Sequence, residues 1–467
     1  MFTVCVQRRY KGRVCAQIAA TDAVYKRRIE IMVKLTFMGA GSTVFAKNVL
    51  GDCILTPELG EFDIALYDID PVRMEDSRLM LENINRKYGG KARITAYSDR
   101  LKALDKADFV VNAIQVGGYE PCTVTDFEIP KKYGLRQTIA DTLGIGGIFR
   151  ALRTIPVLEE FADDIHKVCP DALFLNYTNP MAMLTGYMQR YLGIKSVGLC
   201  HSVQVCAKGL LESLKMDQYI SSCKWTIAGI NHQAWLLDIR DGNGNDLYPE
   251  IKKRSLSGKY ADTMAWDLVR HDMMHRFGYY NTESSEHTAE YNPYYIKSRY
   301  PELIDRFKIP LDEYPRRCVR QIEEWKEMRA KVTSKEIEHE KSREFAAPII
   351  NAMTNGVPYE MHGNVLNNGL ITNLPNNACV EVKCLVDRSG VNPCKVGDLP
   401  EQCAALNRTN INVQNMAIEA ARERKKELVY MAAYLDPHTA AELGMDDIKN
   451  LCDDLFAAHK DWLPEYK

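Results

Sequence analysis

The sequence predicts an α/β protein, in which a parallel β-sheet domain is followed by a mixed, largely helical C-terminal domain. Two observations carry this prediction. Short apolar strands alternate with helix-like runs up to about residue 200, and the pattern beyond about residue 240 is mostly helical. A chain of 467 residues also exceeds one ordinary hydrophobic core, so we expect two large lobes or an elaborated α/β domain.

We expect an extension at 1–31, a first domain at 32–200 and a second domain at 201–467. The extension is rich in Lys and Arg and lacks the apolar stretch of a secretory signal. Because a strand begins directly after Met32, we interpret 1–31 as an over-extended gene start, with a transit-like extension as the alternative.

Composition excludes several classes of partner. The net charge is −2, from 60 basic and 62 acidic residues, so no global field favours nucleic acid or an anionic membrane. No apolar run approaches the about 18 residues that a membrane-spanning helix needs. The 14 cysteines include no C-x-x-C pair, which is typical of reduced thiols in a cytoplasmic protein.

The first domain opens with a glycine turn between two strands. A strand at 33–38 ends in Gly39-Ala40-Gly41-Ser42, a helix-like run follows, and a second strand at 62–67 ends in Asp68-Ile69-Asp70. In the Rossmann fold, such a turn lets the backbone approach a pyrophosphate at a helix N-terminus, and the acid binds ribose hydroxyls. The order therefore predicts a Rossmann-type dinucleotide-binding domain over 32–200, like that of lactate and malate dehydrogenases.

The candidate cofactor contacts follow strand ends: Gly39, Gly41, Ser42 and Thr43 at the turn, Asp68 and Asp70 after the second strand, and Gln115 after a strand at 108–114. Val44 replaces the third glycine of the usual fingerprint, so a generic strand–helix–strand turn is the structural alternative. Asp68 stands at the strand end, with no arginine in its place, and this favours NAD over NADP.

Three later strands also end in polar residues. Asn179 follows a strand at 173–176, Cys200 and His201 follow one at 196–199, and His232 follows one at 225–228. Ligands of open α/β sheets bind outside the carboxyl ends of the strands. One interpretation is that Cys200 is a metal ligand and His201 a proton carrier. The other is that Cys200 is a buried thiol that ends the strand and that His201 caps the following helix. The carboxamide of Asn179 suits sugar hydroxyls, or an Asx turn before a proline.

Beyond residue 240 we expect helices at 261–276, 316–340, 412–432 and 445–459, with an extended piece at 378–386. One segment, 281–291, is conspicuously polar and contains Glu286 and His287. It is either a loop that presents an acid or a base, or an exposed loop with a helix cap.

Together these motifs resemble family 4 glycoside hydrolases over about 33–464. The matching motifs are the turn 39–42, the strand end 68–70, the segments 117–121, 141–147, 176–180 and 198–202, and Asn231-His232. Cys200-His201-Ser202 resembles the α-galactosidase form of the family, so activity on α-galactosides such as melibiose is implied and phosphorylated sugars are not expected.

The resemblance implies an NAD⁺- and Mn²⁺-dependent mechanism, an exception to the two-carboxylate rule of glycosidases. NAD⁺ would take a hydride from C3 of the galactose, a base would remove the acidified C2 proton, and the C1 leaving group would be expelled. Water would add at C1 and the hydride would return to C3. A divalent metal would polarise the C3 oxygen.

The resemblance also implies roles for individual residues. Cys200 and His232 match the metal ligands, Asn179 matches a substrate contact, and His201 is the candidate proton donor. Other members place Tyr or Asp in the region that matches 284–290, and this chain has neither there. We therefore expect Glu286, or else His287, as the C2 base, with Tyr291 as a weaker option.

Two other functions share the dinucleotide domain. One is a net oxidoreductase of the 2-hydroxy-acid dehydrogenase type, which would accumulate NADH with each turnover. The other is a non-enzymatic NAD-binding sensor. The resemblance favours the glycosidase and also implies a homodimer or homotetramer.

Overall fold

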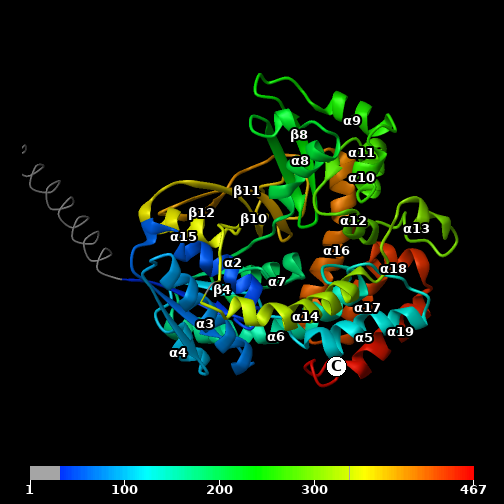
Figure 1. Ribbon diagram of the computed structural model, residues 1–467. Coiled ribbons are helices and arrows are strands. Elements are labelled where there is room, and N and C mark those ends of the chain that lie inside the picture. The colour runs from blue at the N-terminus through cyan, green and yellow to red at the C-terminus, as the bar shows by residue number, and fades with distance from the viewer. Residues whose placement is uncertain (1–31, 336) are drawn as a thin grey trace, which may run out of the picture.

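The computed structural model describes residues 32–335 and 337–467. The expected extension at 1–31 lies outside these residues. A 12-stranded sheet runs through the molecule in the order β3-β2-β1-β4-β5-β6-β10-β11-β7-β8-β9, and β12 pairs with β11. Figure 1 shows helices packed around the first part of this sheet and a group of helices around β8 at the other end.

The strands of the first half are parallel, in the doubly wound order of a Rossmann domain, which confirms the predicted fold class. They are β1 (Val33–Met38), β2 (Phe62–Tyr67), β3 (Ala92–Tyr97), β4 (Phe109–Asn112), β5 (Leu173–Asn176) and β6 (Ser196–Gly198). The helices between them are α2 (Thr43–Ile54), α3 (Pro71–Lys87), α4 (Arg100–Leu104), α5 (Val124–Lys132), α6 (Gly144–Val168) and α7 (Met181–Tyr187).

The sheet continues into the second half with antiparallel strands. Asn364 of β10 is in register with Gly198 of β6, and Glu381 of β11 with Gly229 of β7. These strands are β7 (Lys224–Ile230), β8 (Gln233–Arg240), β9 (Tyr280–Asn281), β10 (Tyr359–Leu366), β11 (Cys379–Asp387) and β12 (Gly390–Pro393). The two halves therefore share one sheet, and the domain boundary at 200 remains a prediction.

The second half is mixed and largely helical, as predicted. Its helices are α8 (Ser202–Ser213), α9 (Tyr248–Leu256), α10 (Ala261–Met264), α11 (Leu268–Phe277), α12 (Ser285–Tyr291), α13 (Glu302–Arg306), α14 (Glu313–Val332), α15 (Ala346–Asn355), α16 (Glu401–Glu423), α17 (Lys426–Leu435), α18 (Pro437–Glu442) and α19 (Met445–Ala458). The single helix expected at 412–432 is wrong. Arg424 ends α16 with a left-handed φ of 54°, and α17 starts after it.

A buried charge cluster fixes the last helix to the first half. Asp126 of α5 accepts two hydrogen bonds from Arg153 of α6, at 3.2 and 2.6 Å, and its Oδ1 lies 2.8 Å from His459 Nε2. Arg153 Nε also donates to the carbonyl of Val116, 3.2 Å away. Because a buried ion pair is costly to break, this cluster holds the loop that follows β4 at the edge of the site.

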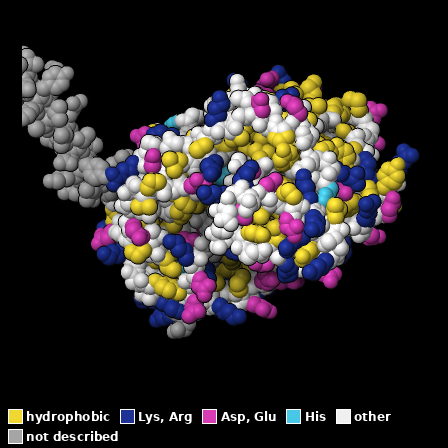
Figure 2. Space-filling model, turned by 90° about the horizontal axis from the view of Figure 1, so that it is seen from above, with side chains coloured by type: hydrophobic (Ala, Val, Ile, Leu, Met, Phe, Trp, Pro, Cys, Tyr) yellow, Lys and Arg dark blue, Asp and Glu magenta, His cyan; other side chains and the backbone are white. Residues whose placement is uncertain are grey.

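The surface agrees with the expectation from composition. On the face shown in Figure 2, basic and acidic side chains are interspersed, with no large area of one sign. Within the described ranges, no helix is both long and apolar enough to cross a membrane.

Candidate active site at the carboxyl edge of the sheet

The glycine turn closes tightly against the end of β4. Gly39 has a φ of +89°, and a Cβ added there would lie 2.7 Å from the Ala113 carbonyl oxygen. The backbone N–H of Gly41 donates to Asp68 Oδ2 at 2.6 Å. The turn therefore requires glycine at position 39, and Asp68 fixes its shape from the end of β2.

The other predicted cofactor residues lie at the starts of α2 and α3 and in the loop after β4. Ser42 and Thr43 begin the helix, and Thr43 Oγ1 accepts a hydrogen bond from Ser77 Oγ at 3.1 Å. Asp70 caps α3, and Gln115 Nε2 donates to Thr123 Oγ1 at 3.3 Å. The free N–H groups of the α2 N-terminus, beside this turn, suit a phosphate.

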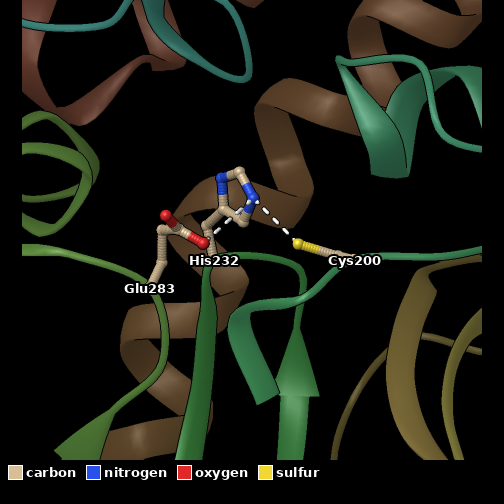
Figure 3. A group of neighbouring side chains, drawn as sticks. All are labelled: Cys200, His232 and Glu283. Carbon is tan, nitrogen blue, oxygen red and sulfur yellow. Dashed lines mark hydrogen bonds and ion pairs between the residues drawn. The ribbon is translucent and has the colours of Figure 1, made fainter. Parts of the chain in front are cut away.

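Three side chains from different strand ends form a group with metal-ligand chemistry. Cys200 follows β6, His232 lies between β7 and β8, and Glu283 follows β9. Cys200 Sγ is 3.3 Å from His232 Nε2, which is 3.6 Å from Glu283 Oε2. Figure 3 shows the imidazole between the thiol and the carboxylate, and their ligand atoms all lie within 4.8 Å of one another.

Two of these residues adopt a backbone conformation that side chains disfavour. His232 has a φ of 62° and Glu283 a φ of 71°. A residue other than glycine rarely occupies the left-handed region, and such strain clusters at functional sites. The fold therefore holds both residues in place although their backbone conformation costs free energy.

The charges of this group fit a divalent cation. Burial raises the pKa of the Cys200 thiol, and the nearby Glu381 and Glu283 raise it further. Burial opposes ionisation of Glu283, but His232 and His287 lower its pKa below the usual value. A cation would offset this buried negative charge and release the thiol proton. Thiolate, imidazole and carboxylate groups are all ligands of divalent transition-metal ions.

The polar segment after β9 forms α12 and lies beside the metal-ligand group. The ring centroid of His287 is 4.3 Å from that of His232, and its Nε2 is 4.0 Å from Glu283 Oε1. Burial, together with His232, lowers the pKa of His287 to about 4, so its ring is neutral near pH 7. Glu286 Oε1 instead contacts Arg317 of α14 at 2.5 Å.

The last two residues of α12 form hydrogen bonds with neighbouring loops. Glu290 accepts hydrogen bonds from the backbone N–H groups of Thr138, Ile139 and Ala140, at 2.6, 3.1 and 3.1 Å. Tyr291 OH donates to the Asn231 carbonyl at 3.1 Å. These contacts fasten α12 to the loop before α6 and to the turn that carries His232.

Asn179 reaches the same region through an acid that sequence reasoning missed. Its Nδ2 donates to Asp141 Oδ2 at 3.2 Å, and its carbonyl accepts from Arg150 Nε at 3.2 Å. Burial opposes ionisation of Asp141, but Arg150, and then His287 and His232, lower its pKa. The structure thus adds Asp141 and Glu283 to the predicted set, and it places His201, whose side chain is 40% exposed, beside Glu344.

Two family models cover most of the chain. Residues 34–216 match the family 4 glycosyl hydrolase model, and residues 227–439 match its C-terminal domain. The chain belongs to glycoside hydrolase family 4. The resemblance inferred from the motifs is therefore confirmed.

Curated relatives align over nearly the whole chain. An alpha-galactosidase of Bacillus subtilis (strain 168) is 62% identical, over 93% of this chain and 100% of its own length. An alpha-galactosidase of Rhizobium meliloti (strain 1021) is 35% identical, over 93% of this chain and 89% of its own.

Solved structures share the fold. A Bacillus subtilis structure assigned as a glucosidase has a TM-score of 0.81 and 26% identity, covering 91% of this chain and 99% of that one. A 6-phospho-alpha-glucosidase from gut microorganisms, in complex with NAD and Mn²⁺, has a TM-score of 0.75 and 20% identity, covering 94% and 100%. A Cryptosporidium parvum malate dehydrogenase has a TM-score of 0.51 and 13% identity, covering 84% and 99%. This last likeness shows a shared fold over most of the chain.

Proposed function

We propose that this family 4 enzyme is an α-galactosidase, which hydrolyses terminal α-D-galactosides such as melibiose with the help of NAD⁺ and Mn²⁺. One observation carries the proposal: the dinucleotide-type glycine turn after β1 and Cys200 after β6 lie at the carboxyl edge of the same parallel strands, and Cys200 groups with His232 and Glu283. The relatives named alpha-galactosidase support the choice of sugar.

The chain offers a fitting place for each cofactor. The turn at Gly39 to Thr43 and the α2 N-terminus suit the pyrophosphate of NAD⁺, and Asp68 suits a ribose, because a carboxylate has about four acceptor positions. Cys200, His232 and Glu283 would hold Mn²⁺. When bound, NAD⁺ reversibly accepts the C3 hydride, and the metal acidifies the neighbouring C2–H by polarising the C3 oxygen.

The protein's own groups then handle substrate and protons. Asn179, held by Asp141 and Arg150, presents its carboxamide to the sugar hydroxyls. The half-exposed His201 gives a proton to the departing C1 oxygen and recovers one from the water that adds at C1.

For removal of the C2 proton we propose Glu286 and His287 of α12. His287 is supported by its neutral ring beside His232, since a neutral imidazole can accept a proton. Glu286 can act only when its contact with Arg317 loosens. Glu283, which is nearer to His232, is proposed as the third metal ligand.

The proposal includes the setting of the enzyme. All described cysteines are free thiols, which supports a reducing, cytoplasmic location. A small-molecule α-galactoside is the substrate, and we propose a homodimer or homotetramer.

The function is tested by omission. After dialysis, the enzyme is assayed on p-nitrophenyl α-galactoside with NAD⁺, Mn²⁺ and a thiol reductant, each left out in turn. Omission of NAD⁺ or Mn²⁺ is expected to stop nitrophenol release, and omission of reductant to reduce it as Cys200 oxidises. No NADH accumulates in the complete mixture. One NADH per turnover would instead establish the dehydrogenase alternative.

A further inference from the structure

A buried carboxylate holds three consecutive backbone N–H groups of the loop before α6. Glu290 of α12 accepts hydrogen bonds from Thr138 and Ile139 through Oε1, at 2.6 and 3.1 Å. Its Oε2 accepts from the N–H of Ala140 at 3.1 Å. The hydroxyl of Thr138 also donates to the carbonyl of Glu286, 2.9 Å away. Both oxygens of this buried carboxylate therefore fix the backbone of one loop.

The same loop is held from its other side by α6. Ala140 has a left-handed φ of 49°, which a residue with a Cβ rarely adopts. Its carbonyl oxygen packs against the start of α6, where a Cβ added to Gly146 would lie 2.6 Å from it. The carboxylate of Glu290 and the glycine face of α6 thus hold Ala140 between them. The next residue along the chain is Asp141, so its backbone position is fixed as well.

Asp141 connects this loop to the predicted substrate contact. Its Oδ2 accepts from Asn179 Nδ2 at 3.2 Å, and its Oδ1 accepts from the hydroxyl of Thr142 at 2.7 Å. The helix that carries Glu290 also carries both candidates for the C2 base, Glu286 and His287. Glu290 therefore joins the helix of the base to the loop that holds Asn179.

We propose that Glu290 is a positioning residue, which holds the Asp141–Asn179 pair in a fixed place relative to α12. A galactoside bound by Asn179 then presents its C2–H to the base on that helix. The inference rests on the proposed function. Glu290 acts through Asp141 and takes part in no bond-making step. Geometry of this kind matters because a displacement of about 1 Å can cost about a hundred-fold in rate.

The test replaces one acceptor of this carboxylate. Glu290→Gln keeps the size of the side chain but turns one oxygen into an NH₂ group, which cannot accept from a backbone N–H. Burial raises the pKa of Glu290 to about 7, against the effect of its hydrogen bonds, so the assays are run at about pH 8. The variant is expected to lose about ten-fold or more in kcat/KM for p-nitrophenyl α-galactoside and in C2 hydrogen exchange.

NAD⁺ and Mn²⁺ affinities of this variant are expected to match wild type, which also shows that it is folded. The glycine turn lies on another loop, and the bond from Tyr291 OH to the Asn231 carbonyl still fastens α12 to the turn of His232. If Glu290→Gln enzyme does not fold, Gly146→Ala displaces the same loop from the side of α6. It is expected to lower kcat/KM in the same way, and an unchanged value would contradict the inference.

A double-mutant cycle separates positioning from a general loss of stability. Asp141→Asn alone is expected to lower kcat/KM, because the contact with Asn179 is weakened. Adding Glu290→Gln to Asp141→Asn is expected to cause little further loss, since Glu290 acts through Asp141. Two losses that multiply, or wild-type kcat/KM in Glu290→Gln enzyme, would overturn the inference.

Glu442→Gln is the matched control. The side chain of Glu442 is 5% exposed, accepts from the backbone N–H of Ser298 at 2.8 Å and pairs with Lys297 at 3.0 Å. Its loss is expected to leave kcat/KM at the wild-type value, and an equal loss in both variants would refute a specific role for Glu290. If wild-type enzyme released no galactose, the proposed function itself would fail, and the inference with it.

Discussion

Cys200→Ser enzyme is expected to cleave p-nitrophenyl α-galactoside about a thousand-fold more slowly than wild type, because a metal that stabilises developing charge is worth several kcal/mol and each 1.4 kcal/mol is ten-fold in rate. The thiolate is the ligand, and a serine hydroxyl keeps its proton at neutral pH. Steady-state rates over a Mn²⁺ titration measure the effect.

NAD⁺ binding to the same variant is expected to persist, since the glycine turn follows β1, which β4 and β5 separate from β6 and Cys200. Cys223→Ser is the matched control, because its thiol is also half-buried but donates to the Ile220 carbonyl, away from the site. Wild-type turnover in Cys200→Ser enzyme would refute the metal assignment.

Glu283→Gln is expected to raise the Mn²⁺ requirement by at least about ten-fold, the lower end of what even an outer-shell partner of a metal contributes. The amide keeps the size of the side chain but loses the carboxylate charge that would bind the cation. Direct Mn²⁺ binding, followed by the electron paramagnetic resonance of the free ion, separates affinity from turnover.

Glu286→Gln is the comparison for this experiment. Its carboxylate contacts Arg317 rather than His232, so Mn²⁺ affinity is expected to stay at the wild-type value. Loss of C2 exchange in this variant would identify Glu286 as the base, and retained exchange would favour His287. Equal Mn²⁺ affinity in Glu283→Gln and wild-type enzyme would remove Glu283 from the ligand set.

The first half was predictable because its signals are local. The strands at 33–38 and 62–67 have the predicted bounds, and each is short, apolar and followed by a glycine or an acid. Cys200 and His232 could be singled out for the same reason. Each follows a strand, but only Cys200 follows a strand of the parallel sheet. The role of His232 as a metal ligand comes from the family resemblance.

The missing site residues have no such signal. Glu283 follows β9, a strand of two residues, and only the pairing of β9 with β8 brings it to His232. Asp141 could be taken as the first residue of a glycine-rich loop. Glu344 lies on a segment between helices and meets His201 only through tertiary packing. Within 281–291, the sequence offers Glu286 and His287 as the C2 base, and the left-handed turn adds Glu283 as a neighbour of Cys200 and His232.

The most direct test of the mechanism is hydrolysis in D₂O, with mass and NMR analysis of the released galactose. If the C2 proton is removed and replaced, the product carries deuterium at C2, while the enzyme accumulates no NADH. Galactose that retains only hydrogen at C2 would contradict the account, because direct displacement at C1 leaves that position untouched.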